Sequence, residues 1–104
     1  MRSYELMILL DPNLQEEESS SLTEKIQKTI TSNHGRTIKV SPWGKRKLAY
    51  ELKGLLEANY VVIDFELEPE NIAKLERTLK LNEKIVRYLI VLGKEVVMPQ
   101  KEKK

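Results

Sequence analysis

Residues 59–70 read NYVVIDFELEPE and contain the clearest strand in the chain, followed at once by the start of a helix. Alternation with a period of two is typical of a strand with one buried face. The apolar set is Val61, Ile63, Phe65 and Leu67, and the mixed set is Tyr60, Val62, Asp64 and Glu66. Proline is tolerated in the first turn of a helix, and glutamates favour its positive end. We therefore predict a strand over residues 59–67 and a helix that opens at Glu68-Pro69-Glu70.

The sequence before this stretch predicts a strand, a helix and another strand. Alternation over residues 4–10 indicates the first strand. A helix is predicted over about residues 15–33, with a buried stripe at Leu22, Ile26 and Ile30. Gly35 is expected to take the left-handed conformation that ends many helices. Residues 36–52 indicate either one long or bulged strand that is interrupted near Pro42, or two short strands. Pro42 favours a sheet edge because proline cannot donate a ladder hydrogen bond.

The sequence around and after residues 59–70 completes the pattern. A loop is expected over residues 53–57. The second helix has a buried stripe at Ile72, Leu75 and Leu79, and Asn82 can end it. Residues 85–92 are apolar except for Arg87, so this last strand is expected to have neighbours on both faces or a partner protein.

The order strand, helix, strand, strand, helix, strand predicts an α+β fold of the ferredoxin-like, split βαββαβ type. Its four-stranded antiparallel sheet should carry both helices on one face. A chain of 104 residues fits one domain, which we place at residues 1–93, and the polar residues 94–104 are expected to form a flexible tail. Two layers leave the other sheet face without cover, where a partner can bind.

Composition excludes much catalytic chemistry. The chain has no cysteine, and His34 is its only histidine, so thiol nucleophiles and two-histidine metal sites are absent. The four glycines form neither a phosphate loop nor a dinucleotide fingerprint. Asp64 and Glu66 share a strand face, but we interpret them as solvated carboxylates without a cleft. We expect no enzyme, metal, cofactor or small-molecule substrate, and no membrane span, because no apolar run approaches about 18 residues.

The charge is concentrated in one segment. The net charge is only +2, yet residues 36–53 carry six basic side chains and one acidic side chain. Such a segment can hold a polyanion locally. The alternative is a lysine-rich strand edge that prevents aggregation, and on charge alone this alternative is slightly favoured.

Consecutive cations in an extended segment support nucleic-acid binding. Alternation sends Lys45 and Lys47 to one side and Arg46 to the other, where each can reach a phosphate. Trp43 can stack on a base, although an aromatic ring folded onto the domain edge is the simpler role. Only Tyr60 offers an aromatic ring on the open face, unlike an RNA-recognition sheet with paired aromatics. These residues therefore favour shape and phosphate recognition by an edge.

Several motifs resemble the family of bacterial and organellar small-subunit ribosomal protein number six. The specific part is Trp43-Gly44-Lys45-Arg46-Lys47-Leu48-Ala49-Tyr50. Arg2 with Tyr4-Glu5, and Asp11-Pro12-Asn13-Leu14 after the first strand, also fit the family. The resemblance extends from about residue 1 to residue 93. One departure is Ala58, where many family members have glycine.

The resemblance implies a structural constituent of the small ribosomal subunit. It implies binding to the central domain of the small-subunit ribosomal RNA together with ribosomal protein number eighteen, in the bacterial cytoplasm or in an organelle. The RNA-binding positions carried over are Arg2, Lys45, Arg46, Lys47 and Arg87. For the protein partner, complementarity of charge and an apolar centre suggest the open-face residues Met7, Tyr60, Val62, Asp64, Glu66 and Leu89.

Two other functions suit the same topology. A small-molecule-sensing regulatory domain would dimerise and gain thermal stability with a metabolite. A phosphate-handling hydrolase would need an arginine-bearing loop with convergent amides. The first loop, Asp11-Pro12-Asn13, has neither arginine nor glycine, which counts against the hydrolase.

Overall fold

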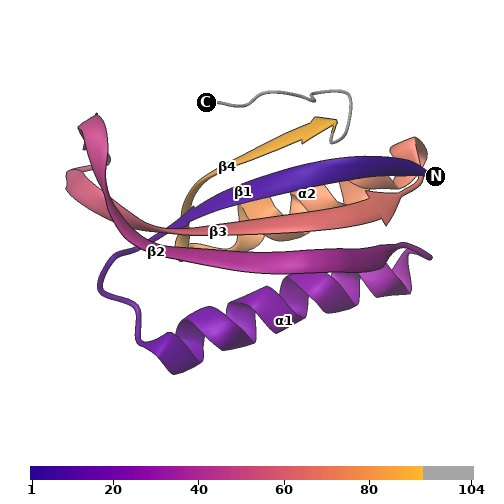
Figure 1. Ribbon diagram of the computed structural model, residues 1–104, viewed down its shortest axis with the longest axis horizontal. Helices are drawn as coiled ribbons and strands as arrows, with labels where there is room; N and C mark the ends of the chain where they lie inside the picture. Colours follow the sequence, from indigo (N-terminus) through magenta and orange to yellow (C-terminus); the bar gives the residue numbers. More distant parts are fainter. Residues whose placement is uncertain (93–104) are drawn as a thin grey trace.

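The computed structural model describes residues 1–92 and contains four strands, two α-helices and a short 3-10 helix. The predicted tail 94–104 lies outside the described residues. In chain order the elements are β1 (Arg2–Leu10), α1 (Glu16–Ser32), β2 (Arg36–Leu52), β3 (Leu55–Leu67), η1 (Pro69–Asn71), α2 (Ile72–Leu81) and β4 (Ile85–Leu92). The strands form one antiparallel sheet in the order β2-β3-β1-β4 (Figure 1). This confirms the predicted ferredoxin-like α+β fold.

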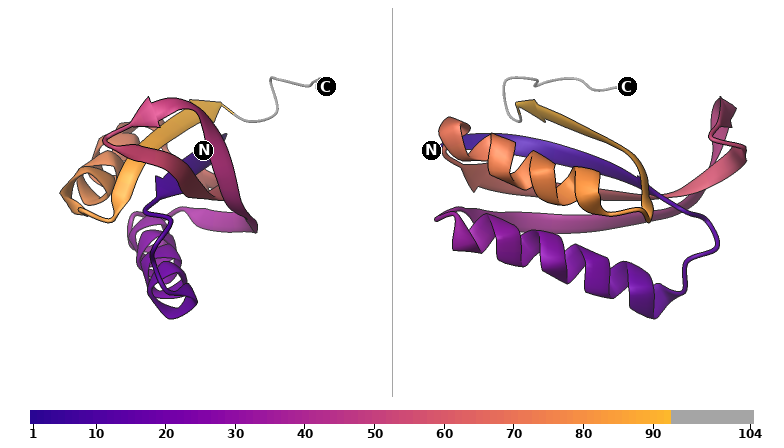
Figure 2. Two further views of the ribbon diagram at one scale, coloured as in Figure 1. Left: turned by 90° about the vertical axis from the view of Figure 1, so that its left-hand side faces the viewer. Right: turned by 180° about the vertical axis from the view of Figure 1, so that it is seen from behind.

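Both helices cover the same face of the sheet, as Figure 2 shows from two sides. The core between these layers takes the apolar side chains of β1 and β3 and the stripes of α1 and α2. Its fully buried members include Leu6, Ile26, Ile63, Phe65 and Leu75. The alternation predicted for β3 is therefore confirmed, and Tyr60 and Asp64 lie on the opposite, open face.

Helix α1 is closed at both ends by local hydrogen bonds. Gln15 and Glu18 form a capping box at its start, where the Gln15 N–H donates to Glu18 Oε1 at 3.1 Å. At its end, His34 N–H donates to the Thr31 carbonyl and Gly35 N–H to the Ile30 carbonyl, which is the Schellman arrangement. The left-handed residue is His34, with φ 69°, so the prediction that Gly35 takes this conformation was wrong.

Strands β2 and β3 extend beyond the rest of the sheet as a two-stranded arm, seen at the left of Figure 1. The arm closes through Lys53 and Gly54, which have φ 52° and 81°, and Leu52 pairs with Leu55. Positive φ at both central residues is the backbone of a tight hairpin turn. The loop predicted over residues 53–57 was therefore wrong, because a two-residue turn replaces it and β3 begins at Leu55.

Strand β2 lies at the sheet edge, as Pro42 predicted. Its pairing with β3 shifts twice before the arm, between Thr37 and Lys39 and between Pro42 and Gly44. At the second shift, Trp43 is the extra residue and Gly44 has φ 84°. A bulge of this kind changes the direction in which side chains point.

Candidate nucleic-acid interface

The cluster Lys45, Arg46 and Lys47 lies on the β2 half of the arm, and all three side chains are exposed. In register, Arg46 lies opposite Ala58, while Lys45 and Lys47 lie opposite Asn59 and Glu57. Arg46 therefore points to the open face and the two lysines to the helix side. The arm presents cations on both of its surfaces.

Arg46 is held by the aromatic side chains next to it. Its Cζ atom lies 5.8 Å from the centroid of the Trp43 ring, and its Nε–H donates to the Trp43 carbonyl at 3.4 Å. The Trp43 ring is stacked in turn on Tyr60, with centroids 6.3 Å apart and planes 7° apart. We call these three side chains the Arg46 stack.

The other two predicted RNA-binding arginines lie in different places. Arg87 on β4 pairs through the sheet with Leu9, which pairs with Tyr60, so Arg87 lies on the open face near the base of the arm. Arg2 pairs with Leu67 on the helix side. Arg2 and Leu9 are seven steps apart along β1, or about 23 Å at about 3.3 Å per residue. The structure therefore brings Arg87 toward the cationic arm and leaves Arg2 at the other end of the sheet.

The open face is partly covered by the arm, which corrects the expectation of a face without cover. A pocket of about 270 Å³ lies between the arm and the sheet. Leu48 and Leu52 of the arm line it together with Met7, Tyr60 and Leu89, among other residues. Leu89 is 58% exposed at the mouth of this region. The sheet and arm together thus form an apolar concave surface.

Val62 does not contribute to this surface as expected. It points to the open face, opposite Met7, yet it is only 3% exposed. Its small side chain lies between Met7 on β1 and Ser41 on β2 in the register. Neighbouring side chains therefore cover most of Val62, and its contact with a protein partner stays a prediction.

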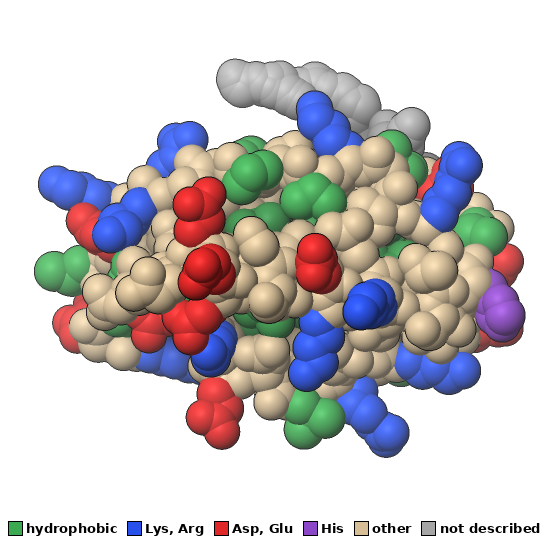
Figure 3. All heavy atoms as spheres, turned by 90° about the horizontal axis from the view of Figure 1, so that it is seen from below, with side chains coloured by type: hydrophobic (Ala, Val, Ile, Leu, Met, Phe, Trp, Pro, Cys, Tyr) green, Lys and Arg blue, Asp and Glu red, His purple; other side chains and the backbone are tan. Residues whose placement is uncertain are grey.

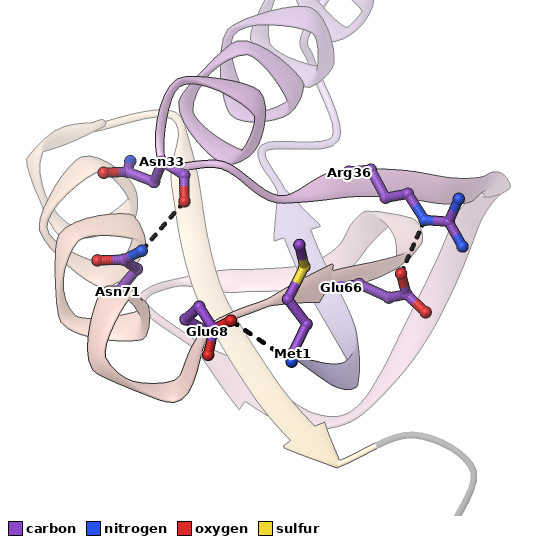
Figure 4. A network of polar contacts seen from close by, with 6 residues as sticks. All are labelled: Met1, Asn33, Arg36, Glu66, Glu68 and Asn71. Carbon is purple, nitrogen blue, oxygen red and sulfur yellow. Dashed lines mark hydrogen bonds and ion pairs between the residues drawn. The ribbon is translucent and has the colours of Figure 1, made fainter.

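The acidic side chains of the open face form two separate groups. Glu5 and Asp64 are direct cross-strand partners, and burial together with the nearby Asp64 charge raises the pKa of Glu5. Glu66 instead accepts a hydrogen bond from Arg36 Nε at 2.7 Å (Figure 4). Glu66 is therefore already neutralised within the chain, and the acidic patch of the open face is Glu5 and Asp64.

The raised pKa of Glu5 has a measurable consequence for stability. The folded chain holds the ionised carboxylate less well than the unfolded chain, so stability falls as pH rises through the folded pKa. We expect Glu5→Gln to raise Tm at pH 7 by about 1–2 °C, because partly exposed charges contribute a few tenths of a kcal/mol. The gain should disappear below the ordinary glutamate pKa of about 4.3.

Thermal unfolding of both forms at pH 7 and at acid pH checks this expectation. Glu83→Gln is the matched control, since Glu83 is an exposed glutamate outside the sheet. A gain in Tm that is equal at both pH values would show that repulsion and burial of the Glu5 charge are not its cause.

The helix side carries charges of both signs. Figure 3 shows acidic and basic side chains interspersed there, with acidic side chains gathered toward one end. The first turn of α1 contains Glu16, Glu17 and Glu18, which suit the positive helix end. Within residues 1–92, no three potential metal ligands come together, and neither helix could cross a membrane.

Sequence reasoning did not find the Arg46 stack. Strict alternation places Trp43 and Arg46 on opposite sides of β2, whereas the bulge places both on the open face. The available signal was Gly44, because glycine within a strand often marks a bulge. The pairing of Glu66 with Arg36 was also missed, since thirty residues separate them in the chain.

Comparison with known proteins gives one consistent result. The family model described as Ribosomal protein S6 matches residues 3–92. The small ribosomal subunit protein bS6 of Cutibacterium acnes is 45% identical over 91 residues, which cover 88% of this chain and 95% of that protein. The protein of the same name from Synechocystis sp. is 41% identical over 105 residues, which cover 100% of this chain and 91% of that protein.

A solved structure agrees with these sequence matches. The crystal structure of 30S ribosomal protein S6 from Thermotoga maritima has a TM-score of 0.85 against this chain at 35% identity. The superposition covers 90% of this chain and 89% of the other.

Proposed function

Because the chain belongs to the ribosomal protein S6 family of the small ribosomal subunit, we propose that it binds the central domain of the small-subunit ribosomal RNA together with ribosomal protein S18. In this role it is a structural constituent and not an enzyme. Its curated relatives named above are bacterial, so we place it on a bacterial ribosome. Family membership also favours this role over a metabolite-sensing regulatory domain.

The observation that carries the proposal is the separation of two kinds of surface. Lys45, Arg46 and Lys47 are exposed on a projecting arm, which suits contact with phosphates from either side. Arg87 extends this basic region onto the sheet. Arg2 would make a second, separate contact at the far end of β1, if the RNA reaches both ends of the sheet.

Away from Arg46 and Arg87, the open face suits a protein partner better than RNA. Glu5 and Asp64 would repel phosphates, yet they attract a basic protein. The pocket beside Met7, Tyr60 and Leu89 supplies apolar surface for the centre of such a contact. Glu66 contributes less, because Arg36 already neutralises it.

Binding to a labelled transcript of the central domain, with and without protein S18, tests this proposal. We expect the two proteins to bind cooperatively, with each raising the affinity of the other by about 5- to 150-fold. A parallel binding experiment without RNA measures the direct pairing of the two proteins. Absence of RNA binding by the pair at about 50 mM salt, where phosphate contacts are strong, would refute the proposed function.

Charge reversal at Asp64 tests the protein interface. We expect Asp64→Lys to slow association with protein S18 by about tenfold at low salt, because complementary charge mainly accelerates encounter. Stopped-flow association rates at low and high salt give the result. Glu83→Lys is the control, since it makes the same charge change away from the open face. Equal slowing by both variants would assign the effect to net charge and exclude Asp64 from the contact.

A further inference from the structure

We propose that Trp43 and Tyr60 are positioning residues that hold the Arg46 guanidinium ready for the RNA. This inference rests on the proposed function and adds a mechanism to it. In this mechanism the aromatic rings act through Arg46 and do not themselves stack on a base.

The bulge in β2 makes the stack possible. Trp43 and Gly44 together oppose the single residue Tyr60, so both fall on the open face. After the bulge the alternation resumes, and Arg46 returns to that same face. Gly44 has φ 84°, a conformation that other residues rarely adopt. One local irregularity therefore brings an arginine, a tryptophan and a tyrosine into one column.

The contacts within the stack restrict the Arg46 side chain at two points. The Arg46 Cζ atom lies 5.8 Å from the centroid of the Trp43 ring, and the Arg46 Nε–H donates a hydrogen bond to the Trp43 carbonyl. Tyr60 supports the Trp43 ring by stacking on it, with the two rings nearly parallel. Tyr60 is anchored in β3, which pairs on both sides within the sheet. The stack thus links a cation on the projecting arm to a central strand.

The geometry leaves the binding end of Arg46 available. Nε donates to the Trp43 carbonyl, and within residues 1–92 this is the only hydrogen bond that the Arg46 side chain donates to the protein. Its two terminal nitrogens can therefore donate to the oxygens of one phosphate. Trp43 is 46% exposed, which keeps the column at the surface where RNA can approach.

Preorganisation predicts a specific energetic pattern. A free arginine loses conformational freedom when it binds, and an arginine already held in place loses less. Removing the tryptophan ring should therefore weaken RNA binding only while Arg46 is present. For one long side chain the expected loss is about two- to tenfold.

A double-mutant cycle with Trp43→Leu and Arg46→Ala tests the inference. The probe is the central-domain transcript with protein S18 present, and affinity is measured at fixed salt. We expect Trp43→Leu to weaken binding two- to tenfold in the otherwise unchanged chain and by less than about twofold in the Arg46→Ala chain. Trp43→Phe, which keeps a ring under the guanidinium, should restore most of the affinity.

The alternatives give different results in the same cycle. If Trp43 stacks directly on a base, or if its loss unfolds the arm, the weakening persists in the Arg46→Ala chain and overturns the inference. Leu56→Ala is the control for an apolar side chain removed from the arm, because Leu56 is 69% exposed and outside the stack. If the unchanged chain does not bind the transcript with S18, the proposed function itself fails.

Discussion

Gly35→Ala is expected to lower the free energy of unfolding by about 3 kcal/mol, because overpacking at a rigid site costs about 1–3 kcal/mol or more. A Cβ atom on Gly35 would collide with the Glu66 carbonyl oxygen and would lie 2.7 Å from Leu67 Cδ1. The carbonyl belongs to the backbone of β3 and cannot rotate away. Either the start of β2 or the end of β3 must move.

The consequence of this clash extends beyond one residue. Gly35 N–H is part of the helix ending, bonded to the Ile30 carbonyl at 2.9 Å. The next residue, Arg36, begins β2 and pairs with Glu66. Asn71 Nδ2 also donates to the Asn33 carbonyl at 3.0 Å (Figure 4). This hydrogen bond connects the end of α1 to the start of α2. Movement at Gly35 therefore loosens a junction between both helices and two strands.

Urea unfolding of the variant measures the loss, and an unchanged m-value would show that the unfolded state is the same. His34→Gly is the matched control, because it changes the adjacent residue and should act in the opposite direction. His34 has φ 69°, and glycine would relieve about 1 kcal/mol of backbone strain. Equal stability of Gly35→Ala and the unchanged chain would mean that the close approach to Glu66 is absent in solution.

The sequence predicted most of the fold because periodicity depends on burial, which is the dominant force in folding. The alternation in β1 and β3 and the four-residue spacing in α1 identified the core correctly. Pro42 placed β2 at the edge through a missing hydrogen-bond donor, and the sheet order confirms it. These features depend on side chains near one another in the chain.

The candidate site was less predictable because its geometry depends on departures from regularity. The one added residue at Trp43 shifts every later residue of β2 to the other side, so Arg46 shares a face with Trp43, and alternation alone cannot anticipate such a shift. The bend of the arm over the sheet and the burial of Val62 depend on contacts between distant segments. The distance between Arg2 and Arg87 along the sheet depends on the register of their strands, which spacing alone does not define.

The bulge in β2 determines which side chains surround Arg46 on the arm. A regular β2 would place Trp43 with the two lysines and leave Arg46 without its aromatic support. The bulge instead places Trp43 on the same face as Arg46, while the two lysines lie on the other surface of the arm. Arg46 is therefore the position where a single charge change should affect RNA binding most.

Arg46→Glu is expected to weaken binding to the central-domain transcript by about 10- to 100-fold, since a charge-assisted hydrogen bond contributes about 1.5–3 kcal/mol. The slope of log affinity against log salt should fall by about one, the value for one lost phosphate contact. Lys28→Glu is the control, because it makes the same charge change on the exposed side of α1, away from the arm. Titrations at several salt concentrations separate the two cases. Weaker binding with an unchanged slope would mean that Arg46 contacts something other than a phosphate, and equal losses in both variants would mean that RNA responds only to the net charge of the chain.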